Sequence, residues 1–174
     1  MAALRRIVLS GGPGAGKTTV LQELARRGFS VMPEVARAIL QGSGGAALRR
    51  DDPDGFAAAI LAREIARHGE AGNGAGTVFF DRGLGDLASM PVTDPALRRS
   101  ILKAVADLRY ETPVFRAPAW QDIYRRDEQR TQSWEEARSS DHAVSAAWKA
   151  AGYDLVDLPL SPPQERASFI LERL

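Results

Sequence analysis

The amino-acid sequence predicts an α/β fold in which helices cover both faces of a five-stranded parallel sheet. Short apolar runs alternate with longer segments of helical periodicity along most of the chain. Such alternation is typical of βαβ units, whose strands lie parallel and are buried on both faces. A glycine-rich turn separates the first apolar run from the first helical segment, which is a common ligand-binding connection in folds of this class.

The individual elements follow from composition and periodicity. Runs rich in branched and aromatic residues predict strands, and amphipathic segments ending at glycine predict helices. The predicted strands cover residues 6–10, 29–32, 77–80, 113–117 and 153–158, and the predicted helices cover residues 18–27, 34–41, 56–68, 95–108, 133–151 and a last segment from 162 to 174. Residues 42–55, rich in Gly and Asp, are expected to form a mobile loop.

Composition excludes several classes of function. A net charge of +1 gives no general attraction to nucleic acid or to an anionic membrane, so we expect neither as a partner. The absence of cysteine excludes disulfides and thiolate chemistry. His68 and His142 lie far apart and are expected on exposed helix positions, which excludes a histidine-rich metal site. No apolar run approaches the length of a membrane span, and we expect one cytoplasmic domain covering residues 1–174.

The turn after the first predicted strand matches a phosphate-binding motif. Residues Gly11, Gly12, Pro13, Gly14, Ala15, Gly16, Lys17 and Thr18 fit the pattern G-x-x-x-x-G-K-[ST]. Glycines allow backbone N–H groups to approach phosphate oxygens, and the following helix directs its positive end at the same anion. In such a loop Lys17 contacts the β- and γ-phosphates and the Thr18 hydroxyl binds Mg²⁺. The motif predicts a three-layer P-loop fold that binds ATP, or alternatively GTP, with Mg²⁺; the adjacent Thr19 is included in the nucleotide site.

A second motif, TVFFDRG, ends the third predicted strand at Asp81. P-loop proteins place the carboxylate that orients Mg²⁺ at this position, although Asp81 could simply cap the strand. Arg82 follows where motor ATPases usually carry a glutamate, which argues against a hydrolytic machine. The chain also lacks the N-K-x-D signature of guanine recognition, so a regulatory GTPase is disfavoured.

Taken together, SGGPGAGKTT, MPEVAR, FFDRGLGD and PAWQDIYRRDEQRTQSWEEA resemble the small stand-alone P-loop family catalogued as an "AAA domain". That family is similar to the ribosylnicotinamide-kinase domain of NadR and, more remotely, to deoxynucleoside and thymidylate kinases. The resemblance covers nearly the whole chain. It implies a nucleoside- or nucleotide-kinase-like fold and a phosphoryl-transfer reaction, without naming the acceptor.

The resemblance also implies roles for individual residues. Glu34, just past the second predicted strand, would take a proton from the acceptor hydroxyl; the alternative is an acid that only favours the start of a helix. Arg82 would contact substrate or phosphate; the alternative is a structural ion pair. Ser161 and Pro162, after the last predicted strand, would lie against the adenine.

The resemblance places a lid at residues 119–138. Arg126 and Arg130 are four residues apart and can share one helical face, where two guanidinium groups would suit the charge of a transferring phosphoryl group. Because arginine is abundant throughout the chain, a solvated helix with Arg–Glu pairs is an equal alternative.

The sequence thus favours an ATP- and Mg²⁺-dependent phosphotransferase acting on a small nucleoside- or nucleotide-like acceptor. A nucleotide-binding regulatory protein with slow hydrolysis is the main alternative. A phospholipid- or GTP-binding adaptor is a third alternative, and the lack of a polybasic cluster counts against it.

Overall fold

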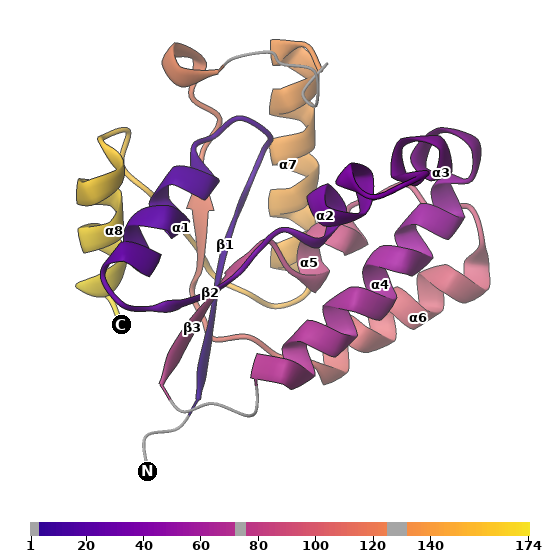
Figure 1. Ribbon diagram of the computed structural model, residues 1–174, viewed down its shortest axis with the longest axis horizontal. Coiled ribbons are helices and arrows are strands. Elements are labelled where there is room, and N and C mark those ends of the chain that lie inside the picture. The colour runs from indigo at the N-terminus through magenta and orange to yellow at the C-terminus, as the bar shows by residue number, and fades with distance from the viewer. Residues whose placement is uncertain (1–3, 72–75, 125–131) are drawn as a thin grey trace.

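The computed structural model describes residues 4–71, 76–124 and 132–174, and within them five strands form one parallel sheet (Figure 1). The strands are β1 (Arg5–Gly11), β2 (Ser30–Met32), β3 (Thr77–Asp81), β4 (Val114–Ala117) and β5 (Leu155–Asp157). Their order across the sheet is β2-β3-β1-β4-β5. The predicted fold class and the five-stranded parallel sheet are confirmed.

Helices cover both faces of this sheet (Figure 1). They are α1 (Lys17–Arg26), α2 (Val35–Gln41), α3 (Gly45–Asp51), α4 (Pro53–Glu70), α5 (Leu84–Ala88), α6 (Pro95–Asp107), α7 (Trp134–Ala150) and α8 (Pro163–Leu171), with a 3₁₀ turn, η2, at Gln121–Ile123. Helices α1 and α8 pack on one face, and α2 and α4–α7 lie over the other.

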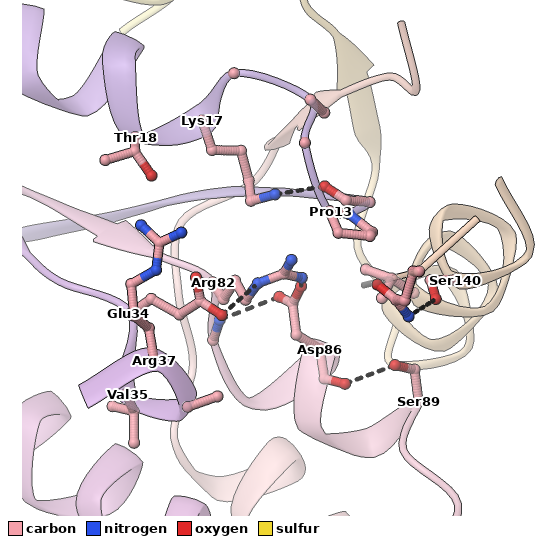
Figure 2. Close-up of a pocket in the computed structure, with 18 of the residues that line it drawn as sticks. Pro13, Lys17, Thr18, Glu34, Val35, Arg37, Arg82, Asp86, Ser89 and Ser140 are labelled. Atoms are coloured by element: carbon pink, nitrogen blue, oxygen red, sulfur yellow. Dashed lines mark hydrogen bonds and ion pairs between the residues drawn. The ribbon is translucent and has the colours of Figure 1, made fainter. Parts of the chain in front are cut away.

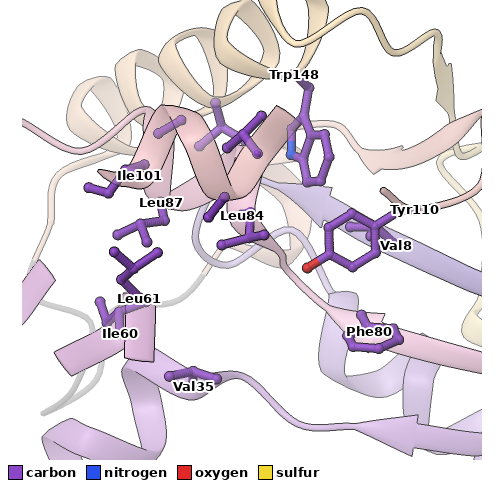
Figure 3. Close-up of a cluster of buried hydrophobic side chains, with 14 of the residues drawn as sticks. Val8, Val35, Ile60, Leu61, Phe80, Leu84, Leu87, Ile101, Tyr110 and Trp148 are labelled. Atoms are coloured by element: carbon purple, nitrogen blue, oxygen red, sulfur yellow. The ribbon is translucent and has the colours of Figure 1, made fainter. Parts of the chain in front are cut away.

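Alternation along β1 divides the core into two clusters. Ile7 and Leu9 pack towards α1 and α8, whereas Val8 between them faces the other side. Figure 3 shows the second cluster, where Val8 and Phe80 of the sheet lie with side chains from several helices. Because successive strand residues point to opposite faces, a buried strand must be apolar on both. This explains the continuous apolar runs in the sequence.

The predicted mobile loop at residues 42–55 is wrong. It contains α3 and the first turn of α4. Gly44 takes a left-handed conformation with φ of 76°, and the Asp52 carboxylate accepts a hydrogen bond from the Gly55 N–H at 2.8 Å. The glycines and aspartates that suggested a loop therefore start two helices instead.

Two further expectations need correction. The helix α5 was not predicted, because its five residues are too few to show helical periodicity. His68 is not exposed: it is buried, its ring packs edge-on against Tyr110, and its Nε2 lies 3.0 Å from the Arg109 carbonyl. His142 is exposed as expected. Among the described helices, none is both long enough and apolar enough to span a bilayer.

Candidate active site

A cleft of about 1610 Å³ opens at the carboxyl edge of the sheet. The P-loop forms one wall, α2–α5 form another, and α7 and the segments after β4 and β5 complete the lining. Drug-sized ligands usually fill sites of about 300–1,000 Å³. The cleft therefore has room for a nucleotide and a second small molecule.

The P-loop is shaped by close backbone packing. Gly11 has φ of 127°, and a Cβ atom at this position would lie 2.2 Å from the Ala117 carbonyl oxygen of β4. Gly14 and Gly16 also have positive φ, at 71° and 77°. Only glycine adopts these conformations without strain, so the sequence fixes a loop that turns its backbone towards the cleft.

Lys17 is buried beneath this loop (Figure 2). Its Nζ donates hydrogen bonds to the carbonyl oxygens of Gly12 at 2.6 Å and Gly11 at 3.2 Å. Burial and the positive charge of Arg82 together lower the pKa of Lys17 to about 8, and Asp81 opposes both effects. The amine can exchange its carbonyl partners for phosphate oxygens.

The rest of the predicted nucleotide site lines the same cleft. Lining residues from that set are Gly12, Pro13, Gly14, Ala15, Gly16, Lys17, Thr18, Thr19, Ser161 and Pro162. Thr18 is exposed near the opening, and Thr19 donates to the Gly16 carbonyl at 2.8 Å. The Ser161 Oγ is buried and has no hydrogen-bond partner in the described residues, so it is available to a ligand.

Asp81 ends β3 next to β1, where Leu9 is its partner in register. It is buried, and its Oδ1 has no hydrogen-bond partner within the described parts of the chain. Burial raises the pKa of Asp81, while the positive charge of Lys17 lowers it. An unsatisfied buried carboxylate oxygen fits a role in orienting Mg²⁺. Asp81 does not itself line the cleft.

No cluster of three or more His, Asp or Glu side chains that could hold a metal occurs in residues 4–71, 76–124 and 132–174. A magnesium ion would therefore depend on Thr18, on Asp81 and on phosphate oxygens of the nucleotide. Oxygen ligands of this kind suit Mg²⁺, which keeps several waters and binds through few protein groups.

Arg82 is held in a left-handed conformation, with φ of 63°. Its guanidinium donates to the Gly11 carbonyl at 3.0 Å and pairs with Asp86 at 2.9 Å and Glu34 at 3.2 Å (Figure 2). Burial disfavours the charge, but Glu34 and Asp86 outweigh burial and raise the pKa of Arg82. A left-handed arginine costs about 1–2 kcal/mol, and these contacts offset that strain.

Glu34 precedes α2 and faces Arg82 across the floor of the cleft (Figure 2). Burial favours its protonated form, but the positive charges of Arg82, Lys17 and Arg37 outweigh burial and lower the pKa of Glu34. The carboxylate is therefore ionised at neutral pH. It lines the cleft and is linked to the P-loop through Arg82, which bonds the Gly11 carbonyl.

Asp86 was not predicted from the sequence. It is buried, and besides Arg82 it accepts hydrogen bonds from Ser10 Oγ at 2.8 Å, Trp148 Nε1 at 3.0 Å and Gly83 N at 3.1 Å. Its position four residues after Arg82 in DRGLGD is a helical spacing that could have indicated the pair. The contact with Trp148 of α7 has no local sequence signal.

Two charged residues from distant helices support the P-loop and were also missed. Asp141 of α7 accepts a hydrogen bond from the Gly12 N–H at 3.1 Å. Arg166 of α8 is buried and donates to the Ala15 carbonyl at 3.0 Å. Both fix loop backbone whose conformation decides which N–H groups face the cleft.

A buried ion pair on α4 borders the cleft, and Glu64 lines it. Arg67 donates to both carboxylate oxygens of Glu64 at 2.7 Å. It also donates to the Pro33 carbonyl at 2.6 Å and the Arg82 carbonyl at 2.8 Å. Burial raises the pKa of Glu64 to about 7, against the effect of Arg67. Arg67 thus links the ends of β2 and β3, next to Glu34 and Asp81.

The predicted lid is only partly described. Trp120, Ile123 and Gln132 line the cleft. Arg126 and Arg130 lie outside the described residues.

Comparison with known protein families identifies the family of this chain. The model of a family described as an AAA domain matches residues 6–166. The chain belongs to this AAA domain family. No curated protein matches the AAA domain chain. The predicted resemblance is confirmed.

Solved structures of P-loop kinases share the fold. Deoxyadenosine kinase from M. mycoides with bound dATP has a TM-score of 0.70 at 12% identity, covering 97% of this chain and 98% of that one. NadR in complex with NR has a TM-score of 0.73 at 19% identity, covering 97% of this chain and 51% of that one, so the AAA domain chain spans about half of it. Thymidylate kinase from Candida albicans has a TM-score of 0.61 at 11% identity, covering 99% and 92%. At these identities the likeness shows the fold alone.

Proposed function

We propose that this AAA domain protein is an ATP- and Mg²⁺-dependent phosphotransferase that acts on a small nucleoside- or nucleotide-like acceptor. The observation that carries the proposal is the arrangement of the cleft. Lys17 and Arg82 share the Gly11 carbonyl oxygen as a hydrogen-bond acceptor, and Glu34 pairs with Arg82, so a carboxylate and a second cation lie beside the P-loop lysine in a cleft with room for two ligands. A nucleotide-binding protein with slow hydrolysis needs no such carboxylate–arginine pair.

In this proposal each residue has a defined part. Lys17 and the loop backbone hold the β- and γ-phosphates, and Thr18 and Asp81 hold Mg²⁺, which neutralises charge on the phosphates. Glu34 accepts the proton of an acceptor hydroxyl, and Arg82 stabilises charge that develops on the transferred phosphoryl group. Ser161 and Pro162 bind the base.

The experiment is a screen for acceptor-dependent conversion of ATP to ADP with nucleosides, nucleotides, ribosides and sugars. We expect at least one acceptor to raise ADP formation well above the acceptor-free rate and to appear as a phosphorylated product. In Lys17→Ala, triphosphate binding and turnover should collapse while circular dichroism shows a folded protein. Equal turnover with and without every acceptor would favour slow hydrolysis instead.

Glu34→Gln tests the proposed base. The substitution preserves size and hydrogen bonding, so ATP binding should be nearly unchanged. Acceptor phosphorylation should fall by about 10²-fold or more, which is the usual contribution of a general base. Unchanged acceptor turnover would show that the reacting group needs no base and that Glu34 serves to orient Arg82.

A further inference from the structure

The carboxylates that line the cleft all have partners. Glu34 and Asp86 pair with Arg82, and Asp86 also accepts hydrogen bonds from Ser10 and Trp148. Glu64 is bound at both oxygens by Arg67. A positively charged acceptor would therefore have to displace an existing ion pair to find a counter-charge in this part of the cleft.

Two cations in the same cleft are unmatched. Arg37 of α2 and Arg49 of α3 line it, and among the described residues neither forms a hydrogen bond or an ion pair. Figure 2 shows the Arg37 guanidinium pointing from α2 into the cleft, towards the side where Thr18 lies. Arg37 is half-buried, and its charge reaches Glu34, whose pKa it helps to lower. Arg49 is exposed at the mouth.

In the proposed function, Lys17 and the loop backbone already account for the donor phosphates. Arg37 and Arg49 belong to the helices of the acceptor wall. A guanidinium pairs with phosphate through two parallel N–H···O bonds, and a half-buried one is the stronger partner. We propose that the acceptor carries a phosphate group, held by Arg37 with Arg49 at the mouth, so that this site takes a nucleoside monophosphate rather than a nucleoside. A hydroxyl of the same molecule receives the γ-phosphoryl group and gives its proton to Glu34, while ADP leaves. The inference rests on the proposed phosphotransferase function.

The test compares each nucleoside with its own 5′-monophosphate as acceptor. Common ribo- and deoxyribonucleosides and nicotinamide riboside are each assayed beside their 5′-monophosphates, with ATP and Mg²⁺. We expect a monophosphate to exceed its parent nucleoside in kcat/KM by about 10-fold or more, the usual effect of one charge-assisted hydrogen bond. A nucleoside preferred over its monophosphate would overturn the inference and leave the phosphotransferase function intact.

Substitutions of Arg37 test whether this residue causes the preference for a monophosphate. Arg37→Gln should raise the KM for the monophosphate about 10-fold or more, while the KM for ATP changes less than about twofold. Arg37→Lys keeps the charge and should restore part of the affinity. Arg63→Gln removes an equal charge from an exposed position of α4 outside the cleft lining, and should change neither KM. An Arg37→Gln protein that loses affinity for ATP instead would place Arg37 on the donor and overturn the inference.

A binding measurement tests the inference even if no acceptor is phosphorylated in the assay. Titration of each monophosphate into protein saturated with a nonhydrolysable ATP analogue and Mg²⁺ is followed by calorimetry. We expect binding that weakens in Arg37→Gln and at higher salt, because exposed charges are screened. If none of the monophosphates binds, the inference is wrong, whether or not phosphotransferase activity has been detected.

Discussion

At the scale of single residues, the protonation of Lys17 depends on what the P-loop holds. In the free protein, burial of this amine and the positive charge of Arg82 lower its pKa to about 8, although Asp81, Glu34 and Asp86 oppose them. Bound phosphates would replace the carbonyls with negative charge and raise the pKa again. Nucleotide binding should therefore favour protonated Lys17.

The affinity for ATP–Mg²⁺ should therefore depend on pH, in a direction that follows from the pKa of Lys17. Below pH 8 Lys17 is already protonated in the free protein, and the affinity for ATP–Mg²⁺ is at its full value. As pH rises through about 8, binding must recover a proton, so the affinity should fall, by at most about tenfold per pH unit. Calorimetry at pH 8.5 in two buffers with different ionisation enthalpies should show proton uptake. Lys17→Arg stays charged and should show none; an equal absence of uptake in the wild type would contradict the prediction.

The sequence could identify residues whose role depends on their neighbours in the chain. The loop from Gly11 to Thr18 works through local backbone geometry, and the motif predicts all of it. Asp141 and Trp148 could not be found in this way. Their partners, Gly12 and Asp86, are 129 and 62 residues away, and the packing of α7 on β1 and α5 brings them together.

At the scale of elements, α4 organises the wall formed by α2–α5. Arg67 joins two parts that are remote in sequence, the end of β2 at Pro33 and the end of β3 at Arg82, and it also binds Glu64 on its own helix. A single guanidinium has enough donors to satisfy all of them. The relative placement of Glu34 and Arg82 therefore depends on a side chain outside both segments.

We predict that Arg67→Ala lowers the free energy of unfolding by about 3–5 kcal/mol, because it leaves Glu64 buried without its partner. Urea unfolding measures the change. Arg63→Ala, at an exposed position of the same helix, is the control and should stay within about 0.5 kcal/mol of the wild type. A loss below 1 kcal/mol in Arg67→Ala would mean that Glu64 becomes protonated or hydrated at little cost.

Most elements were predictable from periodicity, but two short helices were not. The strands and the helices α1, α2, α4, α6, α7 and α8 follow from apolar patterning. The helix α3 lies in a segment whose glycines and aspartates suggested a loop, and the five residues of α5 complete too few turns to show a pattern. Both helices pack on neighbouring helices, α2, α4, α6 and α7, and this packing is not visible in the local sequence.

At the scale of the whole molecule, the two faces of the sheet contribute different walls of the cleft. The face covered by α1 and α8 carries the P-loop and the segment proposed to bind the base, whereas α2–α5 on the other face form the proposed acceptor wall (Figure 1). The proposed donor and acceptor walls therefore belong to different packing layers, and they meet at the carboxyl edge of the sheet.

The last prediction is that the acceptor wall closes when both ligands are bound. Although residues 42–55 form helices and not a loop, Gly45 is the one buried residue of α3, so this helix should open locally at little cost. Its Ala46 and Arg49 line the cleft, and closure over two ligands would exclude water from phosphoryl transfer. Hydrogen exchange is measured on the free protein, with a nonhydrolysable ATP analogue and Mg²⁺, and with acceptor added.

We expect peptides from residues 42–55 and from the part of the lid at 132–137 to gain protection, most strongly when both ligands are present. Binding also stabilises the molecule globally, but amides that exchange through local opening respond only if their own segment contacts the ligand or packs on it. Peptides from α6, which is largely exposed, are the control and should exchange at unchanged rates. Unchanged protection at 42–55 with both ligands bound would show that α3 is a fixed wall, and water would then have to be excluded by the lid alone.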